Sequence, residues 1–232
     1  MTSAHPDELA VVLLPAREIQ LRLANLRRHT APHHDAVERR VDIVGRLGSA
    51  DRYAHLLIRL YGFYEPFEAE LGTVVKRWGL PFDIEARRKA PLLARDLAAL
   101  GVTSRAVDNL PRAGRMPQPT SPQAALGCLY VTEGATLGGQ IIARHVAHRL
   151  GLGPGDGASF FHGYAADTRS RWRTFCSVLA AASTSDVVER AITAGAIDTF
   201  RAYDRWLAMD DAPRTHRPRR RPDEDHQRPL PG

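Results

Sequence analysis

The sequence predicts a single all-α domain, and three observations support this. Apolar residues recur at helical spacing through most of residues 15–208. No stretch shows a sustained alternation of apolar and polar residues, which is the pattern of a half-buried β-strand. A chain of 232 residues is long enough for one well-buried domain and short for two. We therefore expect one helical bundle.

The expected helices follow one another with clear stop signals between them. In chain order they are residues 18–47, 51–77, 84–100, 122–150, 166–182 and 185–208. Gly79 and Pro81 end the second helix, and Gly101 ends the third. The segment Pro111–Pro122, which contains proline and glycine, is interpreted as a linker. The helical domain is thus expected to span residues 15–208.

The two ends of the chain are expected to lie outside this domain. Residues 1–14 are interpreted as a flexible N-terminus, and residues 209–232 as a disordered tail rich in proline and arginine. Asp210–Gly232 holds five prolines and almost no apolar residues, so it cannot bury enough surface to fold. The basic run Arg219–Arg221 could contact nucleic acid, but the acidic run Asp223–Asp225 follows at once and offsets it. We expect a solvated tail and no DNA partner.

Composition and charge are those of an ordinary soluble protein. Hydrophobic residues make up 44% of the chain and charged residues 25%. The formal net charge of +6 permits an anionic partner, such as an acidic protein or a carboxylate ligand, without choosing among them. The two cysteines, Cys128 and Cys176, lie far apart, which argues against a disulfide framework or a cysteine zinc site and favours a reducing compartment. The chain has no basic signal-peptide region and no run approaching the ~20 apolar residues of a membrane span, so we expect a cytoplasmic protein with no membrane partner.

Several common catalytic motifs are missing from the sequence. It contains no GxxxxGKS/T phosphate loop, no HExxH zinc motif and no GxSxG nucleophile motif. Two segments remain as candidates for chemistry, residues 26–38 and residues 130–143.

The first candidate segment, residues 26–38, holds two adjacent histidines in an expected helix. Histidine is a common axial ligand of haem iron. His33 lies nearer the centre of the apolar stripe that includes Val37, and His34 lies at its edge, so periodicity does not choose between them. Glu38 is four residues past His34 on the same face, where it could accept the second ring N–H of that histidine and fix its tautomer. The alternative is an ordinary packed or surface histidine.

The second candidate segment, residues 130–143, carries three glycines inside an otherwise helical pattern. They are Gly134, Gly138 and Gly139. Each costs about 1 kcal/mol relative to alanine, so the cluster indicates a kink, a tight helix contact or a flat ligand lying against bare backbone. A dinucleotide-binding loop is a weaker interpretation, because no strand precedes the glycines and the GxGxxG spacing is absent.

Together the two segments resemble the haem oxygenase family, in particular its bacterial branch associated with phytochromes. The family's proximal segment has the form LRxxTxxxHxxxE, which is matched by Leu26, Arg27, Thr30, His34 and Glu38. Its distal helix has the form GxxxGGQ, which is matched by Gly134, Gly138, Gly139 and Gln140. Residues 88–101 are similar to a further family helix. The resemblance covers most of residues 20–208 and selects His34 over His33 as the iron ligand.

The resemblance implies that haem lies between a proximal and a distal helix as both cofactor and substrate. It implies oxidative opening of the haem ring to biliverdin, with release of carbon monoxide and iron. Electrons would come from a separate ferredoxin or reductase, and the product could supply a bacteriophytochrome with its chromophore. The protein is therefore expected to be a biliverdin-producing haem oxygenase.

The resemblance also implies roles for particular residues. The expected catalytic residues, which would let the distal backbone press near the bound oxygen, are Gly134, Gly138 and Gly139. The expected haem-binding residues are His34, which would hold the iron, Glu38, Arg27, Arg173 and Phe200. Arginine suits the carboxylates of the haem propionates, and Arg171 is an alternative to Arg173 in that role. Phe200 would form part of the haem wall.

Three departures from the family pattern bear on activity. Ala135 stands where animal members have an aspartate that orders distal water, and Leu129 stands where they have a tyrosine, although Tyr130 is adjacent. Pro32 is expected to kink the proximal helix or to start a helix there, which could shift His34. Ala135 and Pro32 keep open a second hypothesis, a non-catalytic haem carrier or sensor. A helical module unrelated to haem, with a basic tail that binds nucleic acid, is a third.

Overall fold

The computed structural model describes residues 15–209, and within that range it is built from helices and their connections, with no strand. The elements are α1 (Ala16–Val41), α2 (Ile43–Arg46), α3 (Ala50–Arg77), η1 (Glu85–Arg87), α4 (Ala90–Ala99), α5 (Ser104–Asp108), α6 (Pro122–Leu150), α7 (Ser159–His162), η2 (Ala165–Asp167), α8 (Thr168–Ala182) and α9 (Asp186–Ala208). The all-α prediction is confirmed. The predictions for residues 1–14 and 210–232 lie outside the described residues. Among the described helices, none is both long enough and apolar enough to cross a membrane.

Serine side chains cap the long helices α3, α6 and α9. Ser49, Ser121 and Ser185 each accept a hydrogen bond from the backbone N–H three residues further on, which satisfies one of the free donors at a helix start. At the other end of α6, Gly151 adopts a positive φ of 70°, where glycine avoids the steric cost of a side chain. These local signals explain why the expected segments 51–77, 122–150 and 185–208 correspond closely to helices.

The expected helix 18–47 is divided in the structure. Asp42 adopts a left-handed conformation with φ of 41°, so α1 ends at Val41 and the short helix α2 follows. The Asp42 side chain accepts a hydrogen bond from the backbone of Gly45, which stabilises this break. The prediction of one continuous helix over residues 18–47 is therefore wrong.

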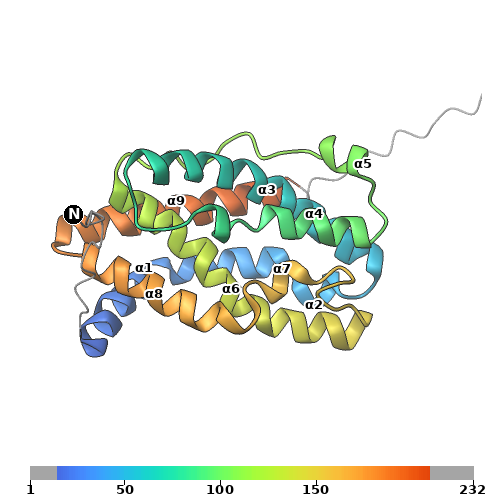
Figure 1. Cartoon of the computed structure of the whole chain (residues 1–232), viewed down its shortest axis with the longest axis horizontal. Helices are drawn as coiled ribbons and strands as arrows, with labels where there is room; N and C mark the ends of the chain where they lie inside the picture. Colours follow the sequence, from blue (N-terminus) through green and yellow to red (C-terminus); the bar gives the residue numbers. More distant parts are fainter. Residues whose placement is uncertain (1–14, 210–232) are drawn as a thin grey trace, which may run out of the picture.

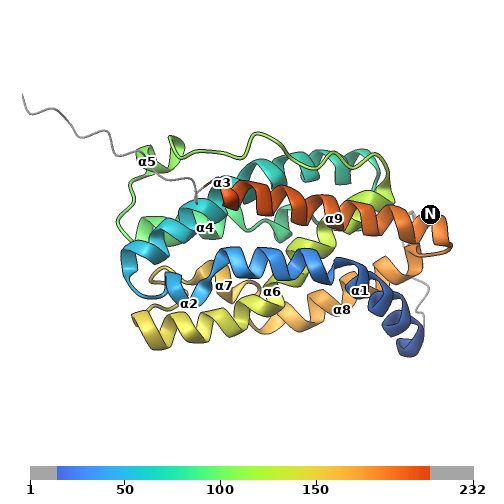
Figure 2. The same ribbon diagram turned by 180° about the vertical axis from the view of Figure 1, so that it is seen from behind.

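Helix α1 runs through Pro32 and does not start there. Proline removes one backbone donor, and the hydroxyl of Thr30 donates to the carbonyl of Leu26 one turn earlier. Both features permit a helix to bend. Figure 2 shows that α1 changes direction along its length while remaining one helix. The structure thus agrees with a bend in the proximal helix and not with a new start.

Helix α6 crosses the bundle obliquely and packs against α9 more extensively than any other pair of elements does (Figure 1). The close approach depends on two glycines. A Cβ atom added to Gly127 would overlap the carbonyl oxygen of Ile192, and one added to Gly195 would overlap that of Ala124. Helix α6 also contacts α3, α7 and α8, while α1 packs on α9 and α8. The core therefore brings α1, α6, α8 and α9 together around the two candidate segments.

Candidate functional site

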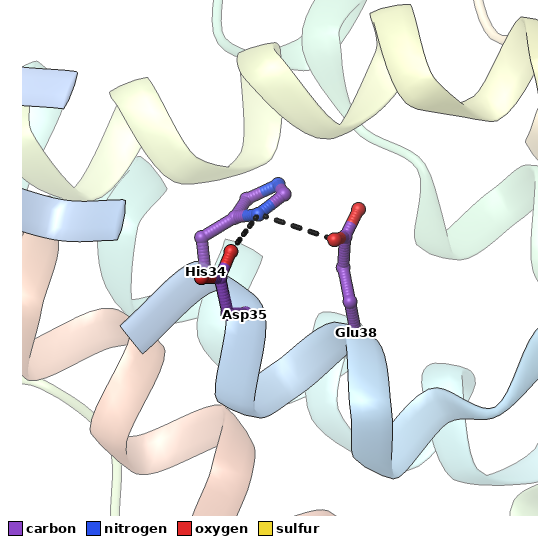
Figure 3. A group of neighbouring side chains, drawn as sticks. All are labelled: His34, Asp35 and Glu38. Atoms are coloured by element: carbon purple, nitrogen blue, oxygen red, sulfur yellow. Dashed lines mark ion pairs between the residues drawn. The ribbon is translucent and has the colours of Figure 1, made fainter. Parts of the chain in front are cut away.

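The structure places His34 on the exposed surface of α1 beside two carboxylates. Nδ1 of His34 lies 3.6 Å from Oε2 of Glu38 and 3.8 Å from Oδ1 of Asp35. Figure 3 shows the His34 and Glu38 side chains extending to the same side of α1, where the ribbon of α6 passes. The negative charges favour a proton on Nδ1, because that proton lies nearest to them. The Nε2 lone pair is then the one that can bind a metal.

These three side chains are also the group in the described part of the chain that could hold a metal ion by themselves. One ligand atom from each of His34, Asp35 and Glu38 lies within 4.8 Å of the others. All three residues are exposed, with 53%, 60% and 69% of their side-chain surface accessible. Exposed acidic groups on one helix bind ions weakly, since water competes for the same charges. By themselves these three side chains therefore form a weak metal site.

Phe200 of α9 lies directly against His34. The two ring centroids are 5.8 Å apart with the rings nearly perpendicular, an edge-to-face contact. Phe200 is buried, and its ring contacts His34 and not the neighbouring, partly buried His33. The structure thus brings together the two predicted residues, His34 and Phe200, that lie 166 positions apart in the sequence. An aromatic ring beside the imidazole restricts how that imidazole can turn.

Arg27 lies on the same helix as His34, close to Tyr130 of α6. Burial raises the pKa of the Tyr130 hydroxyl, while the interaction with Thr30 and the positive charge of Arg27 lower it. Arg27 itself is exposed. Its guanidinium is therefore near the place where α1 meets α6 and remains accessible to an anionic group.

The three predicted glycines of α6 meet three different surroundings. A Cβ added to Gly139 would lie 2.9 Å from the carbonyl oxygen of Phe161, so this glycine permits close packing of α6 on α7. A Cβ at Gly134 would lie 3.6 Å from the ring of Trp172, an ordinary contact. A Cβ at Gly138 would meet nothing within 4 Å. Only Gly139 is thus explained by helix packing, whereas Gly138 leaves bare backbone facing open space.

Helix α8 supplies an aromatic face and two arginines next to this segment. Trp172 lies 5.9 Å from the Tyr130 ring and 5.7 Å from the Phe175 ring. Arg171 donates to the carbonyl of Ala86 at 2.9 Å and stacks its guanidinium 4.4 Å from the Tyr164 ring. Arg173 is exposed. Of the two alternatives for a propionate partner, Arg171 is already engaged elsewhere.

A buried ionic cluster lies immediately before Gly134. The carboxylate of Glu133 is 1% exposed and accepts hydrogen bonds from Arg87 at 2.5 Å, Lys89 at 3.1 Å and the Tyr164 hydroxyl at 2.7 Å. Burial lowers the pKa of Lys89, and the charges of Glu133 and Glu68 oppose this. The cluster was not predicted, although the sequence has one signal for it: Glu133 is a charged residue within the apolar stretch of α6.

An open surface hollow lies away from these residues. It has a volume of about 480 Å³ and is lined by the N-terminal half of α1 and the start of α9, including Arg22, Arg28 and Glu189. None of the predicted site residues lines it. The hollow is wide open to solvent and does not mark the site.

Comparison with known proteins matches residues 21–209 to the Heme oxygenase family. The chain belongs to the haem oxygenase family. It is 34% identical over 171 residues to a heme oxygenase of Xanthomonas campestris pv. campestris (strain 8004), an alignment that covers 71% of this chain and 93% of that protein. The structure superposes on that of heme oxygenase from Leptospira interrogans with a TM-score of 0.67 and 21% identity, covering 81% of this chain and 98% of the other. The second likeness shows that the fold is that of a haem oxygenase.

Membership of this family supports an enzyme of haem degradation. The family match includes α1, with His34 and Glu38, and α6, with the three glycines. Trp172, Glu133 and Lys89 were not among the predicted site residues. Their positions near the candidate segments could not be predicted from the sequence, because they depend on how α4, α6 and α8 pack together.

Proposed function

We propose that this haem oxygenase binds haem between α1 and α6, with His34 as the iron ligand, and opens the ring to biliverdin. The observation that carries the proposal is an exposed imidazole on α1 that extends to the side where α6, the helix with bare backbone at Gly138, passes (Figure 3). His34 has a carboxylate near Nδ1, which leaves Nε2 as the donor atom, and Gly138 offers open space in place of a side chain. A flat ligand with a metal at its centre would use the imidazole on one side and lie against the open backbone on the other.

The donor set fits iron held by a neutral imidazole. Glu38 orients the ring of His34 through the charge near Nδ1, as outer-sphere carboxylates do for metal-binding histidines. Phe200 limits rotation of the same ring by its edge-to-face contact. When bound, haem supplies the iron that activates oxygen and the porphyrin carbon that is oxidised, and the products are biliverdin, carbon monoxide and iron.

Exposed arginines suit the carboxylates of the haem propionates. Arg27 and Arg173 are both exposed, on α1 and α8 respectively. Their guanidinium groups can form paired hydrogen bonds with carboxylates and would orient the ring within the site. Arg171 is less suited, because its guanidinium is held by the Ala86 carbonyl and the Tyr164 ring.

The glycine segment would exclude water and aim the oxidation at the ring edge. Side-chain atoms at Gly134 and Gly138 would keep a ligand away from the backbone, so their absence permits a close steric contact. Ala135 brings no carboxylate to this segment. The electrons would come from a ferredoxin or a reductase, and a bacteriophytochrome could take up the biliverdin.

Haem titration of the purified protein, followed by a ferredoxin–reductase system under air, tests the proposal. Wild type and His33→Ala should give a sharp Soret band that decays to the spectrum of biliverdin. His34→Ala should lose the normal band and turnover, because its iron lacks the proximal nitrogen. Haem that binds through His34 but survives reduction under air would identify a haem carrier or sensor, and no specific band would refute haem binding.

A further inference from the structure

The glycine segment of α6 is held at both of its ends. At one end, Gly139 packs against the backbone of Phe161 in α7. At the other end, Glu133 precedes Gly134 and joins the buried ionic cluster described above. Helical glycines lower the stability of the turn that contains them, so residues 134–138 depend on such external contacts to keep one conformation.

Glu133 connects α6 to two separate loops. Arg87 and Lys89 come from the connection between α3 and α4, and Tyr164 comes from the connection between α7 and α8. The Lys89 ammonium also donates to the Arg87 carbonyl at 2.7 Å and to the Tyr164 hydroxyl at 2.9 Å. Each of its three N–H groups therefore has an acceptor, as a buried ammonium requires.

The centre of the cluster is buried: the side chains of Glu133 and Lys89 are 1% and 3% exposed, while Arg87 and Tyr164 at its edge are partly exposed. Glu68 accepts hydrogen bonds from the backbone N–H groups of Lys89 at 2.6 Å and Ala90 at 3.0 Å and lies 3.8 Å from Nε of Arg88, so Glu68 and Glu133 share the positive charges of Arg87, Arg88 and Lys89. A cavity lined by both Glu68 and Glu133 measures about 10 Å³, room for about one water molecule. In such surroundings the attraction between the charges is only weakly screened, and removing one partner leaves the others buried and unpaired.

We propose that Glu133, with Lys89 and Tyr164, positions the glycine segment 134–138 against the bound haem and thereby sets where the ring is opened. The role towards haem rests on the proposed function, whereas the contacts that position the segment exist in the protein without haem. Glu133, Lys89 and Tyr164 act through the backbone of α6 and are positioning residues.

The first measurement is hydrogen–deuterium exchange of the haem-free protein. Tyr164→Phe removes one hydroxyl from the cluster, and Glu133→Gln removes its central charge while keeping an acceptor. Tyr53→Phe is a matched control, because the buried Tyr53 hydroxyl also donates one hydrogen bond, to the carbonyl of Gly157 at 2.8 Å. Exchange in the peptide that contains residues 134–138 should rise about tenfold in Tyr164→Phe, the factor expected for one lost buried hydrogen bond, and should stay unchanged in Tyr53→Phe.

The second measurement concerns the haem-loaded protein. In Tyr164→Phe the C–O stretch of the haem–carbon monoxide complex and the ratio of biliverdin isomers should change, while haem affinity stays within about twofold because the haem ligands are intact. A merely structural role would lower the melting temperature and leave both signatures as in wild type.

The outcomes separate the inference from the proposed function. Equal exchange in Tyr164→Phe and Tyr53→Phe, or unaltered isomers and C–O stretch beside normal wild-type turnover, would overturn the inference and leave the function standing. A wild type that binds no haem refutes the function and the role towards haem together, and the exchange data then decide whether the cluster holds the segment.

Discussion

At the scale of single residues, neighbouring glycines of α6 have different reasons to be glycine. Gly139 lies where a Cβ would crowd the Phe161 carbonyl, and Gly138 lies where a Cβ would meet nothing. The first requirement comes from packing in the protein chain. Packing does not explain the glycine at position 138, and we expect that a bound ligand requires it. Alanine substitutions separate the two because they add the same methyl group at both places.

Gly138→Ala should raise stability and weaken haem binding. The added methyl group improves helix propensity by up to about 1 kcal/mol, and it should raise the haem dissociation constant about tenfold or more if haem lies against this backbone. Urea unfolding of the haem-free protein and haem titration measure the two effects. Gly139→Ala is the comparison and should lose about 1–3 kcal/mol of unfolding free energy. Unchanged haem affinity in Gly138→Ala would show that the ligand does not contact this position.

The residues next to His34 in the sequence do not distinguish it from His33, whereas its neighbours in the folded structure do. Periodicity put His33 nearer the centre of the apolar stripe and His34 at its edge without choosing between them, and the structure shows His34 to be the more exposed of the two. What distinguishes His34 is its contact with Phe200 and the Glu38 carboxylate near Nδ1. The Phe200 contact joins two helices and could not be read from one segment.

At the scale of helices, the packing of α6 on α9 determines where the glycine segment lies. Gly127 and Gly195 remove side chains from each helix at the point of closest approach, and the Cys128 thiol donates to the Gly195 carbonyl at 3.6 Å. The two helices interlock over this region. The position of α6 against α9 is consequently fixed about two turns before Gly134.

Gly127→Ala and Gly195→Ala should each destabilise the fold strongly. The new methyl group would overlap a backbone carbonyl that cannot move without separating the helices, so we expect a loss of about 3 kcal/mol or more. Denaturant unfolding followed by circular dichroism gives the value. Gly72→Ala in α3 is the control, since a Cβ there meets nothing within 4 Å, and it should be neutral or stabilising. Losses of equal size in Gly72→Ala and Gly127→Ala would contradict the packing argument.

At the scale of the whole molecule, burial makes the free energy of unfolding depend on pH in the alkaline range. Burial raises the pKa of the Cys128 thiol from 9.0 to about 11. Between these values the unfolded chain releases the thiol proton while the folded chain keeps it, so rising pH favours unfolding. The stability associated with this group is complete below pH 9 and is lost progressively up to pH 11, by roughly 1.4 kcal/mol per pH unit.

Cys128→Ala should therefore flatten the decline of stability between pH 9 and pH 11. Unfolding free energies at pH 7, 9, 10 and 11 for wild type and variant give the two slopes. Lys89, whose pKa is lowered by burial, contributes stability that rises with pH, but both proteins contain it and its effect cancels in the difference. Identical slopes would mean that the thiol titrates equally in the folded and unfolded chains.

Much of the fold was predictable because its causes are local. The segments expected at 51–77, 122–150 and 185–208 became α3, α6 and α9, since serine caps, glycine stops and apolar spacing act within a few residues. The break at Asp42 and the short helices α5 and α7 were missed. A helix of four or five residues has too few apolar positions to show a period, and a single aspartate in a left-handed conformation leaves no periodic trace.

The sequence by itself determined that this protein is all-helical and that two of its segments resemble those of a haem oxygenase. Each of these rests on residues that are close together in the chain. The tertiary structure alone decided which glycine packs and which is open, that Phe200 meets His34, and that Glu133 is joined to Lys89 and Tyr164. These contacts unite residues from different helices, and burial and desolvation, which give them their strength, exist only after those helices have packed.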